Sequence, residues 1–235
     1  MDLNQAKVIV TGGSSGIGKS TAQLLKEAGA EVLITGRNAD KLARVADELG
    51  VKGLAFDIAE TDQLEAKAKE AVALLGGVNV LINNAGIGEF AKLGGITLDM
   101  FHRVYTTNIF GLTMFTQSLL PELKAAKGGN IINIASTAGV KGFAFGSVYS
   151  SSKFALRGLT QCWQAELRRD DIRVVLVNPS EVTTAFAQEN REERENQPKK
   201  LRPIEIAHTI KSVLEMDDRG FIPEVTVFAT NPWEE

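Results

Sequence analysis

Tyr149 and Lys153 lie four residues apart in SVYSSSKFALRG, and Ser136 precedes the tyrosine by thirteen residues in NIINIASTAG. In a helix, residues four apart share one face, so the Lys153 ammonium would lie beside the Tyr149 phenol. An unperturbed phenol has a pKa of roughly 10, and a neighbouring cation lowers that pKa by favouring the phenolate. The three residues therefore predict an acid/base tyrosine tuned by lysine, with a serine hydroxyl that holds a carbonyl oxygen.

A glycine-rich turn near the N-terminus predicts a nucleotide site. Residues 8–10 form a short apolar run, typical of a strand buried on both faces of a parallel sheet. The turn after it carries Gly12, Gly16 and Gly18, and a segment with apolar residues at helical spacing follows. Small residues let the backbone approach a pyrophosphate, and a helix start offers N–H groups and a positive dipole end. A tight turn alone would explain the glycines, but their place between strand and helix favours nucleotide binding.

The chain resembles the short-chain dehydrogenase/reductase family over nearly its whole length. The resemblance rests on motifs in the family's order and spacing: TGxxxGxG at residues 11–18, NNAG at residues 83–86, Asn108 placed 28 positions before Ser136, and the Tyr149–Lys153 pair. The sequence is therefore identified as a member of this family. Membership implies an NAD(P)-dependent oxidoreductase built on a Rossmann-type domain.

The resemblance implies four catalytic residues, Asn108, Ser136, Tyr149 and Lys153. In reduction, Tyr149 would donate a proton to the substrate carbonyl oxygen while the nicotinamide delivers hydride to the carbonyl carbon. Ser136 would hydrogen-bond the same oxygen. Lys153 would lower the tyrosine pKa and hold the nicotinamide ribose, and Asn108 would orient a water that connects Lys153 to solvent. The structural alternatives are a local cap for Asn108 and a strand-end contact for Ser136.

The same resemblance implies the cofactor-binding residues. With Tyr149 and Lys153 they are Gly12, Ser14, Ser15, Gly16, Ile17, Gly18, Arg37, Asn38, Asp57, Ile58, Asn84, Ala85, Gly86, Pro179, Val182 and Thr184. The family's PGxVxT segment shows one departure, because Ser180 replaces the glycine beside the nicotinamide. Serine makes the local backbone less permissive, so the substitution affects the expected shape of the substrate pocket more than cofactor binding.

The end of the second predicted strand indicates which nicotinamide cofactor binds. In such folds an acidic residue about 20 positions after the glycine motif binds the adenosine ribose, whereas a nearby arginine accommodates a 2′-phosphate. Gly36 stands where NAD-dependent members carry aspartate, and Arg37 follows it. An arginine grips phosphate through its planar fork, so the sequence favours NADP(H); alternatively, Arg37 begins a helix and points into solvent. Asp57 matches the family's adenine-contacting aspartate, although a helix N-cap role is also open.

Strands and helices alternate from Lys7 to Asn178, which predicts an α/β fold with a doubly wound, mainly parallel sheet and helices on both faces. At 235 residues and 44% hydrophobic content, we expect a single domain over residues 1–235. The seven predicted strands are Lys7–Thr11, Glu31–Thr35, Lys52–Phe56, Val78–Asn83, Asn130–Ala135, Ile172–Asn178 and Glu224–Ala229. Residues 185–202 are highly charged and poor in apolar side chains, which predicts a mobile substrate lid or, equally well, a solvated surface helix.

Composition argues against several classes of function. The net charge is −3 with both signs interspersed, so no basic stripe indicates nucleic acid. Apolar runs are too short to cross a membrane, and the N-terminus MDLNQAK lacks a signal-peptide pattern, so we expect a cytoplasmic protein. His, Cys, Asp and Glu residues do not cluster at metal-ligand spacing, so no metal is expected. The single cysteine, Cys162, falls among apolar helix positions, which predicts a packed core thiol.

The sequence supports two substrate classes. Length and motifs look most like bacterial 3-oxoacyl-[acyl-carrier-protein] reductases, which implies fatty acid biosynthesis and basic residues that meet an acidic carrier. Lys127, Arg168 and Arg169 are the candidates, although Asp170 and Asp171 dilute the patch. The C-terminal PEVTVFATNPWEE lacks the glycine-rich ending of that group. It resembles broad-specificity carbonyl reductases, which act on small ketones, diketones or hydroxy acids.

Four phenylalanines are candidates for an apolar pocket wall, or for the core: Phe90, Phe143, Phe145 and Phe186. A third class of function is a non-catalytic NADP(H)-binding sensor. Such proteins generally lose a catalytic residue, whereas this chain keeps all four. The sequence therefore favours an enzyme.

Two long predicted helices, after Leu98 and after Ser147, carry more apolar surface than packing on the sheet requires. Their excess apolar residues are Phe110, Met114, Phe115, Leu119, Phe154, Leu159 and Trp163. Exposed apolar patches mark interfaces, and in the resembled family the equivalent helices pair about a twofold axis. We expect a homodimer, or a homotetramer built from two dimers. The alternative is that these residues pack into the core of one chain.

Overall fold

The computed structural model describes residues 1–186, 195 and 197–232. Within them, parallel strands form one sheet in the order β3-β2-β1-β4-β5-β6-β7. The strands are β1 (Lys7–Val10), β2 (Glu31–Gly36), β3 (Lys52–Ala55), β4 (Val80–Asn83), β5 (Asn130–Ile134), β6 (Arg173–Pro179) and β7 (Glu224–Val227). Every pairing is parallel, so the predicted doubly wound α/β fold is confirmed and the sheet is more uniform than predicted.

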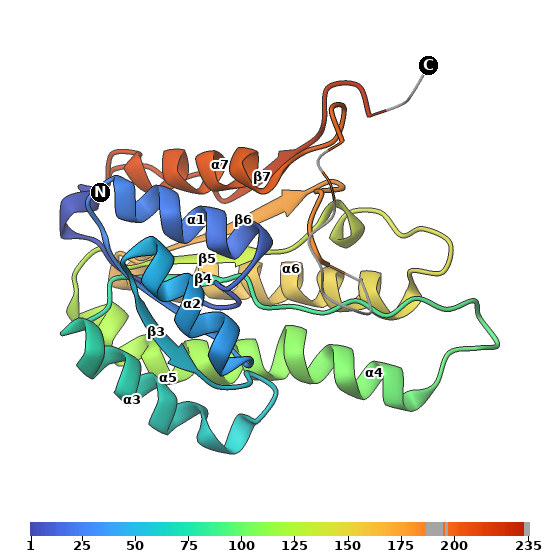
Figure 1. The fold of residues 1–235 in the computed structure, drawn as a ribbon, viewed down its shortest axis with the longest axis horizontal. Helices are drawn as coiled ribbons and strands as arrows, with labels where there is room; N and C mark the ends of the chain where they lie inside the picture. The colour runs from blue at the N-terminus through green and yellow to red at the C-terminus, as the bar shows by residue number, and fades with distance from the viewer. Residues whose placement is uncertain (187–194, 196, 233–235) are drawn as a thin grey trace.

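Helices cover both faces of the sheet (Figure 1). One face carries α1 (Gly16–Glu27), α2 (Ala39–Leu49) and α7 (Pro203–Glu215). The other carries α3 (Leu64–Leu75), α5 (Leu112–Ala125) and α6 (Ser147–Leu167). The helix α4 (Leu98–Tyr105) runs into α5 through a π-helical segment, η3 (Thr106–Gly111). Short 3₁₀ turns are η1 (Leu3–Gln5), η2 (Thr61–Gln63), η4 (Thr137–Gly139) and η5 (Arg168–Asp170).

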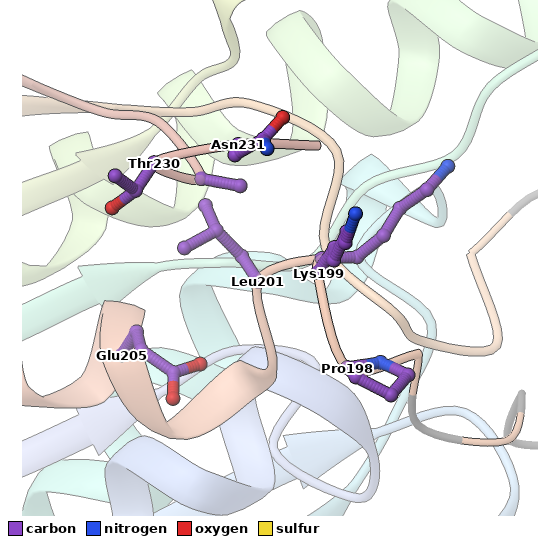
Figure 2. A pocket seen from close by; sticks show the side chains of 8 residues that line it. Pro198, Lys199, Leu201, Glu205, Thr230 and Asn231 are labelled. Atoms are coloured by element: carbon purple, nitrogen blue, oxygen red, sulfur yellow. The ribbon is translucent and has the colours of Figure 1, made fainter. Parts of the chain in front are cut away.

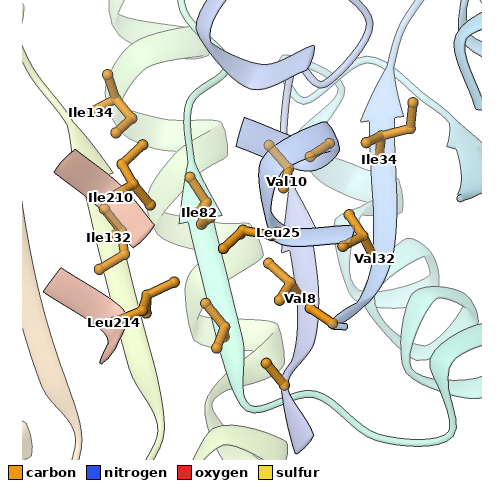
Figure 3. Packing of buried hydrophobic residues seen from close by; sticks show 14 of the residues in the cluster. Val8, Val10, Leu25, Val32, Ile34, Ile82, Ile132, Ile134, Ile210 and Leu214 are labelled. Atoms are coloured by element: carbon orange, nitrogen blue, oxygen red, sulfur yellow. The ribbon is translucent and has the colours of Figure 1, made fainter. Parts of the chain in front are cut away.

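The core explains why the central strands carry runs of apolar residues. Val8 and Val10 in β1 face α1 and α7, whereas Ile9 between them faces α3 and α5. Figure 3 shows the first of these clusters, with strand side chains packed against Leu25 of α1 and Ile210 of α7. Because helices cover both faces, both sets of alternating side chains are buried. Because all these strands are parallel, their carboxyl ends meet at one edge of the sheet. Ligands bind at that edge in open parallel sheets.

Two predictions about helix residues are wrong. Cys162 is exposed, because the buried stripe of α6 runs through Thr160 and Leu167 and leaves Cys162 on the solvent side. Phe115 and Leu119 are fully buried rather than excess surface. They lie on the side of α5 that packs against α3 and the sheet, so they belong to the core of one chain.

Half of the predicted lid, residues 185–202, lies outside the described residues. At its far end, Leu201 pairs with Val182 in a parallel bridge, which joins the entry to α7 to the segment after β6. A cavity of about 290 Å³ lies between this entry and the chain after β7 (Figure 2). Its lining residues are Pro198, Lys199, Lys200, Leu201, Glu205, Ala229, Thr230 and Asn231. None of the four candidate catalytic residues, all of which the structure describes, lines this cavity.

Candidate active site

The glycine-rich turn joins β1 to α1 at the point where the strand order reverses between β1 and β4. Gly12 and Gly16 have positive φ angles of 65° and 51°, which side chains rarely tolerate. A Cβ on Gly18 would lie 2.4 Å from the Gly12 carbonyl oxygen. Ser15 is the N-cap residue of α1, and among the described residues its side chain makes no capping hydrogen bond. The bare turn and the helix start therefore fit a phosphate-bearing cofactor.

The loop after β4 is tied to this turn by hydrogen bonds. Asn84 Nδ2 donates to the carbonyl oxygens of Thr11 and Gly12, at 2.9 and 3.1 Å. The backbone N–H groups of Asn84 and Ala85 both donate to the Thr11 hydroxyl at 3.0 Å. These contacts engage the amide nitrogen of the Asn84 side chain. Through them Asn84 holds the shape of the cradle, which is the turn at residues 12–18 together with the start of α1.

Asn108 lies in the π-helical segment η3, a type of segment that is frequent at functional sites. Its Oδ1 accepts from the Ile87 N–H at 2.9 Å, and its Nδ2 donates to the Ile87 carbonyl at 2.9 Å and to Ser152 Oγ at 3.0 Å. A Cβ on Gly86 would lie 3.3 Å from Asn108 Oδ1 and 3.7 Å from Lys153 Nζ. These partners lie 21 and 44 residues away, so the side chain does not form the local cap that the sequence left open; it holds the loop after β4 against α6.

Ser136, Tyr149 and Lys153 meet at the carboxyl end of β5. Ser136 is the N-cap residue of η4, and its Oγ accepts from the Ala138 N–H at 3.1 Å. Tyr149 and Lys153 lie in the first turns of α6 and are both buried. Lys153 Nζ donates to the Ile134 carbonyl at 2.9 Å and lies 5.8 Å from the centroid of the Tyr149 ring. The structure therefore brings the three predicted residues together.

Burial controls the charge states of this pair. It raises the pKa of Tyr149 to about 12, and a hydrogen bond with the Ser136 side chain opposes this by a smaller amount. Burial also lowers the pKa of Lys153 to about 8. The expected fall of the Tyr149 pKa toward neutrality, with Lys153 as its cause, is therefore not met in this structure, where the pKa is raised instead. The physical reason is that desolvation of the phenolate dominates, while the ammonium is hydrogen-bonded to the Ile134 carbonyl.

Gly139 is a positioning residue that the sequence analysis did not single out. A Cβ there would lie 2.8 Å from the Lys153 carbonyl oxygen and 3.2 Å from the Lys153 Cβ. The turn η4, which begins directly after Ser136, therefore packs on the bare backbone of α6. The sequence does contain a hint of this packing, because Gly139 lies three residues after the candidate catalytic Ser136. Glycine is common where another segment of backbone approaches closely.

The carboxyl end of β2 lies beside the glycine turn. A Cβ on Gly36 would lie 3.3 Å from Ser14 Oγ and 3.5 Å from Leu42 Cδ1. Arg37 follows on the surface and is exposed, and Asn38 is the N-cap residue of α2, with its Oδ1 accepting from the Lys41 N–H at 2.8 Å. The exposed arginine fits the predicted contact with a 2′-phosphate. The Asn38 side chain is committed to its helix.

Three further predicted cofactor residues make local contacts. Asp57 Oδ1 accepts from the Ala59 N–H at 3.0 Å within a turn, whereas the N-cap residue of η2 is Glu60, so Asp57 does not cap a helix. Ile58 is buried in the core beneath α5, and Ile17 packs against the core on the α1 side. Their side chains stabilise the rim of the cradle, and contact with a cofactor would fall to the backbone around them.

The segment after β6 returns over the glycine turn. A Cβ on Gly16 would lie 3.1 Å from Thr184 Cγ2, so Thr184 closes one side of the cradle. Pro179 is buried at the end of β6, and the Ser180 N–H donates to the Val227 carbonyl at 2.8 Å. Serine is accommodated here because its backbone does not adopt a positive φ angle, and its N–H extends the pairing with β7. Val182, predicted beside the cofactor, is held by its bridge to Leu201.

Two phenylalanine rings lie beside the Tyr149 ring. The centroids of the Phe90 and Phe186 rings lie 5.6 and 5.4 Å from the centroid of the Tyr149 ring.

Glu89, which precedes Phe90 in the chain, forms a bidentate ion pair with Arg103. Oε1 lies 2.6 Å from Nε, and Oε2 lies 2.8 Å from Nη2. This pair was not predicted. Glu89 lies in a loop and Arg103 lies fourteen residues later in α4, so the local spacing of charges in the sequence does not predict this ion pair.

The basic residues proposed for a carrier protein lie at the other end of α6. Arg168 follows the last residue of that helix, and with a rise of 1.5 Å per residue it lies about 28 Å along the axis from Tyr149. Its guanidinium lies 5.3 Å from the centroid of the Phe221 ring, and Lys124 pairs with Asp170 at 2.8 Å. In one protomer this patch does not border the site.

Two further observations concern the described part of the chain. Its His, Cys, Asp and Glu residues form no group of three or more that could hold a metal ion. Its helices include none with both the length and the apolar character needed to cross a bilayer.

Comparison with known proteins gives consistent matches. Residues 6–195 match the short chain dehydrogenase family. An uncharacterised oxidoreductase of Staphylococcus aureus (strain N315) is 34% identical over 229 residues, covering 96% of this chain and 97% of that protein. The alcohol dehydrogenase of the archaeon Thermococcus sibiricus, complexed with 5-hydroxy-NADP, is similar with a TM-score of 0.88 and 26% identity, covering 98% and 99% of the two chains. A metagenomic short-chain oxidoreductase in complex with NADP has a TM-score of 0.82 and 31% identity, covering 95% and 97%.

Proposed function

Because the chain belongs to the short-chain dehydrogenase family and is thus an oxidoreductase, we propose that it reduces a carbonyl to a secondary alcohol with NADPH. One observation carries the proposal: Ser136, Tyr149 and Lys153 converge at the carboxyl end of β5, on the same edge of the sheet as the glycine cradle. That edge is where ligands bind in open parallel sheets.

The side chains have complementary roles in this proposal. NADPH, when bound, supplies the hydride; the turn at residues 12–18, the loop at residues 84–86 and Thr184 would hold it. Tyr149 donates its proton to the carbonyl oxygen, and a pKa of about 12 keeps the phenol protonated at neutral pH. Ser136 hydrogen-bonds the same oxygen and fixes its position. Lys153 keeps a positive charge below its pKa of about 8 and stabilises the phenolate that proton transfer leaves behind.

The preference for NADP(H) rests on Gly36 and Arg37. Glycine at position 36 places no acidic side chain where it would repel a 2′-phosphate. Arg37 is exposed beside the cradle. Two of the similar solved structures contain NADP or a derivative of it.

For the substrate, we propose a 3-oxoacyl thioester or a related ketone. The second candidate is a small ketone, diketone or hydroxy acid without a carrier. The distance of Arg168 from Tyr149 within one protomer favours a free small molecule. A carrier-linked substrate would require basic residues that lie closer to the site than Arg168 and Arg169.

A spectrophotometric assay of NADPH oxidation tests the proposal, with ketones, diketones and an acetoacetyl thioester as substrates. Tyr149→Phe removes the proton donor, so turnover should fall by about 100-fold or more while NADPH binding, followed by fluorescence, stays close to wild type. The chain's other tyrosine provides the matched control: Tyr105 packs on Phe101 in α4, and Tyr105→Phe should retain turnover. Tight NADPH binding without turnover of any carbonyl would instead support a sensor.

A further inference from the structure

We propose that Phe90, Phe143 and Phe186 form an aromatic subsite that selects uncharged ketones and aldehydes with an aryl group beside the carbonyl. The inference rests on the proposed carbonyl reduction and specifies its substrate class. It starts from one juxtaposition: three phenyl rings from three separate segments gather at the candidate proton donor.

The rings stand at distances typical of interacting aromatic pairs. Phe186 lies 5.4 Å from Tyr149 with 52° between the ring planes, and Phe90 lies 5.6 Å from Tyr149 at 58°. Phe143 lies 6.1 Å from Phe90 at 42°. Tilted rings at these separations present both faces and edges to a further ring, which is the arrangement that aromatic groups prefer. An aryl group of a substrate whose carbonyl reaches Tyr149 would join this cluster.

A glycine makes room for two of the rings. A Cβ on Gly88 would lie 2.9 Å from Phe186 Cζ and 3.0 Å from Phe90 Cζ. Both rings therefore rest on bare backbone, where any side chain would push them apart. The loop that carries Gly88 and Phe90 is held in two places: the Ala91 N–H donates to the Phe145 carbonyl at 3.0 Å, and Glu89 is clamped by Arg103.

The subsite exposes apolar surface next to a buried proton donor. Phe90 is 41% exposed and Phe143 is 52% exposed, whereas Tyr149 is only 8% exposed. Exposed apolar groups that gather in one place mark binding surfaces more often than chance. Here they border the atom that must touch the substrate carbonyl, so the surface they offer is available to the substituent of that carbonyl.

Several charged side chains near these rings have partners of their own. Glu89 pairs with Arg103, Lys153 Nζ donates to the Ile134 carbonyl, and Lys92 lies 5.5 Å from the centroid of the Phe145 ring. Three phenyl rings carry no charge that would offset the desolvation of a substrate carboxylate. The subsite therefore favours neutral substrates over keto acids.

Four ketones test this selection with wild-type enzyme and NADPH: acetophenone, cyclohexyl methyl ketone, 4-acetylbenzoate and 2,3-butanedione. We expect kcat/KM for acetophenone to exceed that for cyclohexyl methyl ketone by about tenfold, the scale of one or two aromatic contacts. Adding the carboxylate in 4-acetylbenzoate should remove this advantage. Saturation-transfer NMR with enzyme and NADP⁺ provides a readout besides turnover, because acetophenone ring protons should receive magnetisation and those of 4-acetylbenzoate should receive less.

Substitutions of single phenylalanines test whether these rings cause the preference for acetophenone. Phe186→Leu and Phe90→Leu should each lower the ratio of kcat/KM for acetophenone to that for 2,3-butanedione by about tenfold, mainly through KM. Phe221→Leu is the control, because that ring lies 5.3 Å from the Arg168 guanidinium, at the far end of α6 from Tyr149, and should leave the ratio unchanged. If wild type reduces 2,3-butanedione without preferring acetophenone, or if the two variants leave the ratio unchanged, the subsite is refuted while carbonyl reduction stands. If wild type reduces none of these ketones and no acetoacetyl thioester, the proposed function fails and the subsite with it.

Discussion

At the scale of single residues, burial places Tyr149 and Lys153 in charge states suited to the reduction proposed above. The phenol of Tyr149, with its pKa raised to about 12, is protonated at neutral pH and can act as a donor. Lys153, with its pKa lowered to about 8, is still charged at neutral pH but loses its proton far more readily than an exposed lysine. Desolvation thus shifts the two pKa values in opposite directions.

Lys153 should make stability depend on pH within a defined window. Between pH 8 and about 10.5 the unfolded chain binds the lysine proton and the folded protein does not. The free energy of unfolding of wild type, relative to Lys153→Met, should therefore rise with pH across this window, by up to about 1.4 kcal/mol per pH unit. Urea denaturation of both proteins at several pH values measures the difference. A difference that stays flat up to pH 10 would show that the folded pKa is not lowered.

Gly36 and Arg37 should set the cofactor preference. Arg37→Ala removes a charge-assisted contact of about 1.5–3 kcal/mol, which predicts a ten- to hundredfold shift from NADPH toward NADH. Gly36→Asp should shift it further, since a side chain there meets only Ser14 Oγ at 3.3 Å and Leu42 Cδ1 at 3.5 Å and fits with a small adjustment. The ratio of kcat/KM for the two cofactors measures the effect. Arg219→Ala, in the turn after α7, is the control, and equal wild-type affinity for NADH and NADPH would refute the assignment.

At the scale of elements, the sequence predicted what local patterns determine. The alternation of strand and helix patterns identified all seven strands, with ends within two residues of those observed. The signal was clearest for the central strands, because strands covered on both faces carry continuous apolar runs. Motif spacing identified Ser136, Tyr149 and Lys153, since chain order fixes which strand or helix carries them. The burial of Tyr149 and the Glu89–Arg103 pair could not be predicted, because both depend on how distant segments meet.

The sequence also did not predict which positions of a helix are buried. The apolar spacing around Cys162 indicated a buried thiol, but a helix on a sheet buries one stripe only, and the phase of that stripe is set by tertiary contacts. In α6 the stripe includes Thr160, whose hydroxyl accepts from Asn133 Nδ2 of β5 at 2.9 Å. Asn133 in turn accepts from Asn83 Nδ2 of β4 at 2.9 Å. This buried polar chain fixes α6 against the sheet, and hydrophobic periodicity carries no trace of it.

The packing of η4 on α6 yields a prediction about Gly139. Alanine there would place a Cβ 2.8 Å from the Lys153 carbonyl oxygen, so the helix that carries Tyr149 and Lys153 must shift relative to Ser136. We expect Gly139→Ala to cost about 1–3 kcal/mol in stability and to lower kcat by more than tenfold, since small displacements of reacting groups are costly. Gly142→Ala is the control, because a Cβ at that position meets open space among the described residues. Equal kcat for the two variants would show that η4 does not position the site.

At the scale of the whole molecule, apolar side chains also gather away from the site. A groove of about 680 Å³ lies where η2, η3, α5 and α6 meet, and its lining residues are Thr61, Asp62, Thr106, Ile109, Phe110, Thr113, Met114 and Leu159. Phe110 is 51% exposed and Met114 is 42% exposed. Phe154 on α6 is also exposed. These residues are the part of the predicted interface that remains after Phe115 and Leu119 are assigned to the core.

We therefore expect a symmetric homodimer that buries this groove, because exposed apolar patches of this kind mark interfaces and self-association is usually twofold. Light scattering at micromolar concentration should give about 51 kDa, twice the chain mass of 25.3 kDa, or a multiple of it if dimers pair. Phe110→Glu places a charge at the centre of the groove and should reduce the mass to that of one chain, with helix content unchanged by circular dichroism. Leu74→Glu is the control, since Leu74 is 42% exposed on α3, outside the groove. A wild-type mass of one chain would refute the interface, and a Phe110→Glu protein that remains dimeric would place it on another surface.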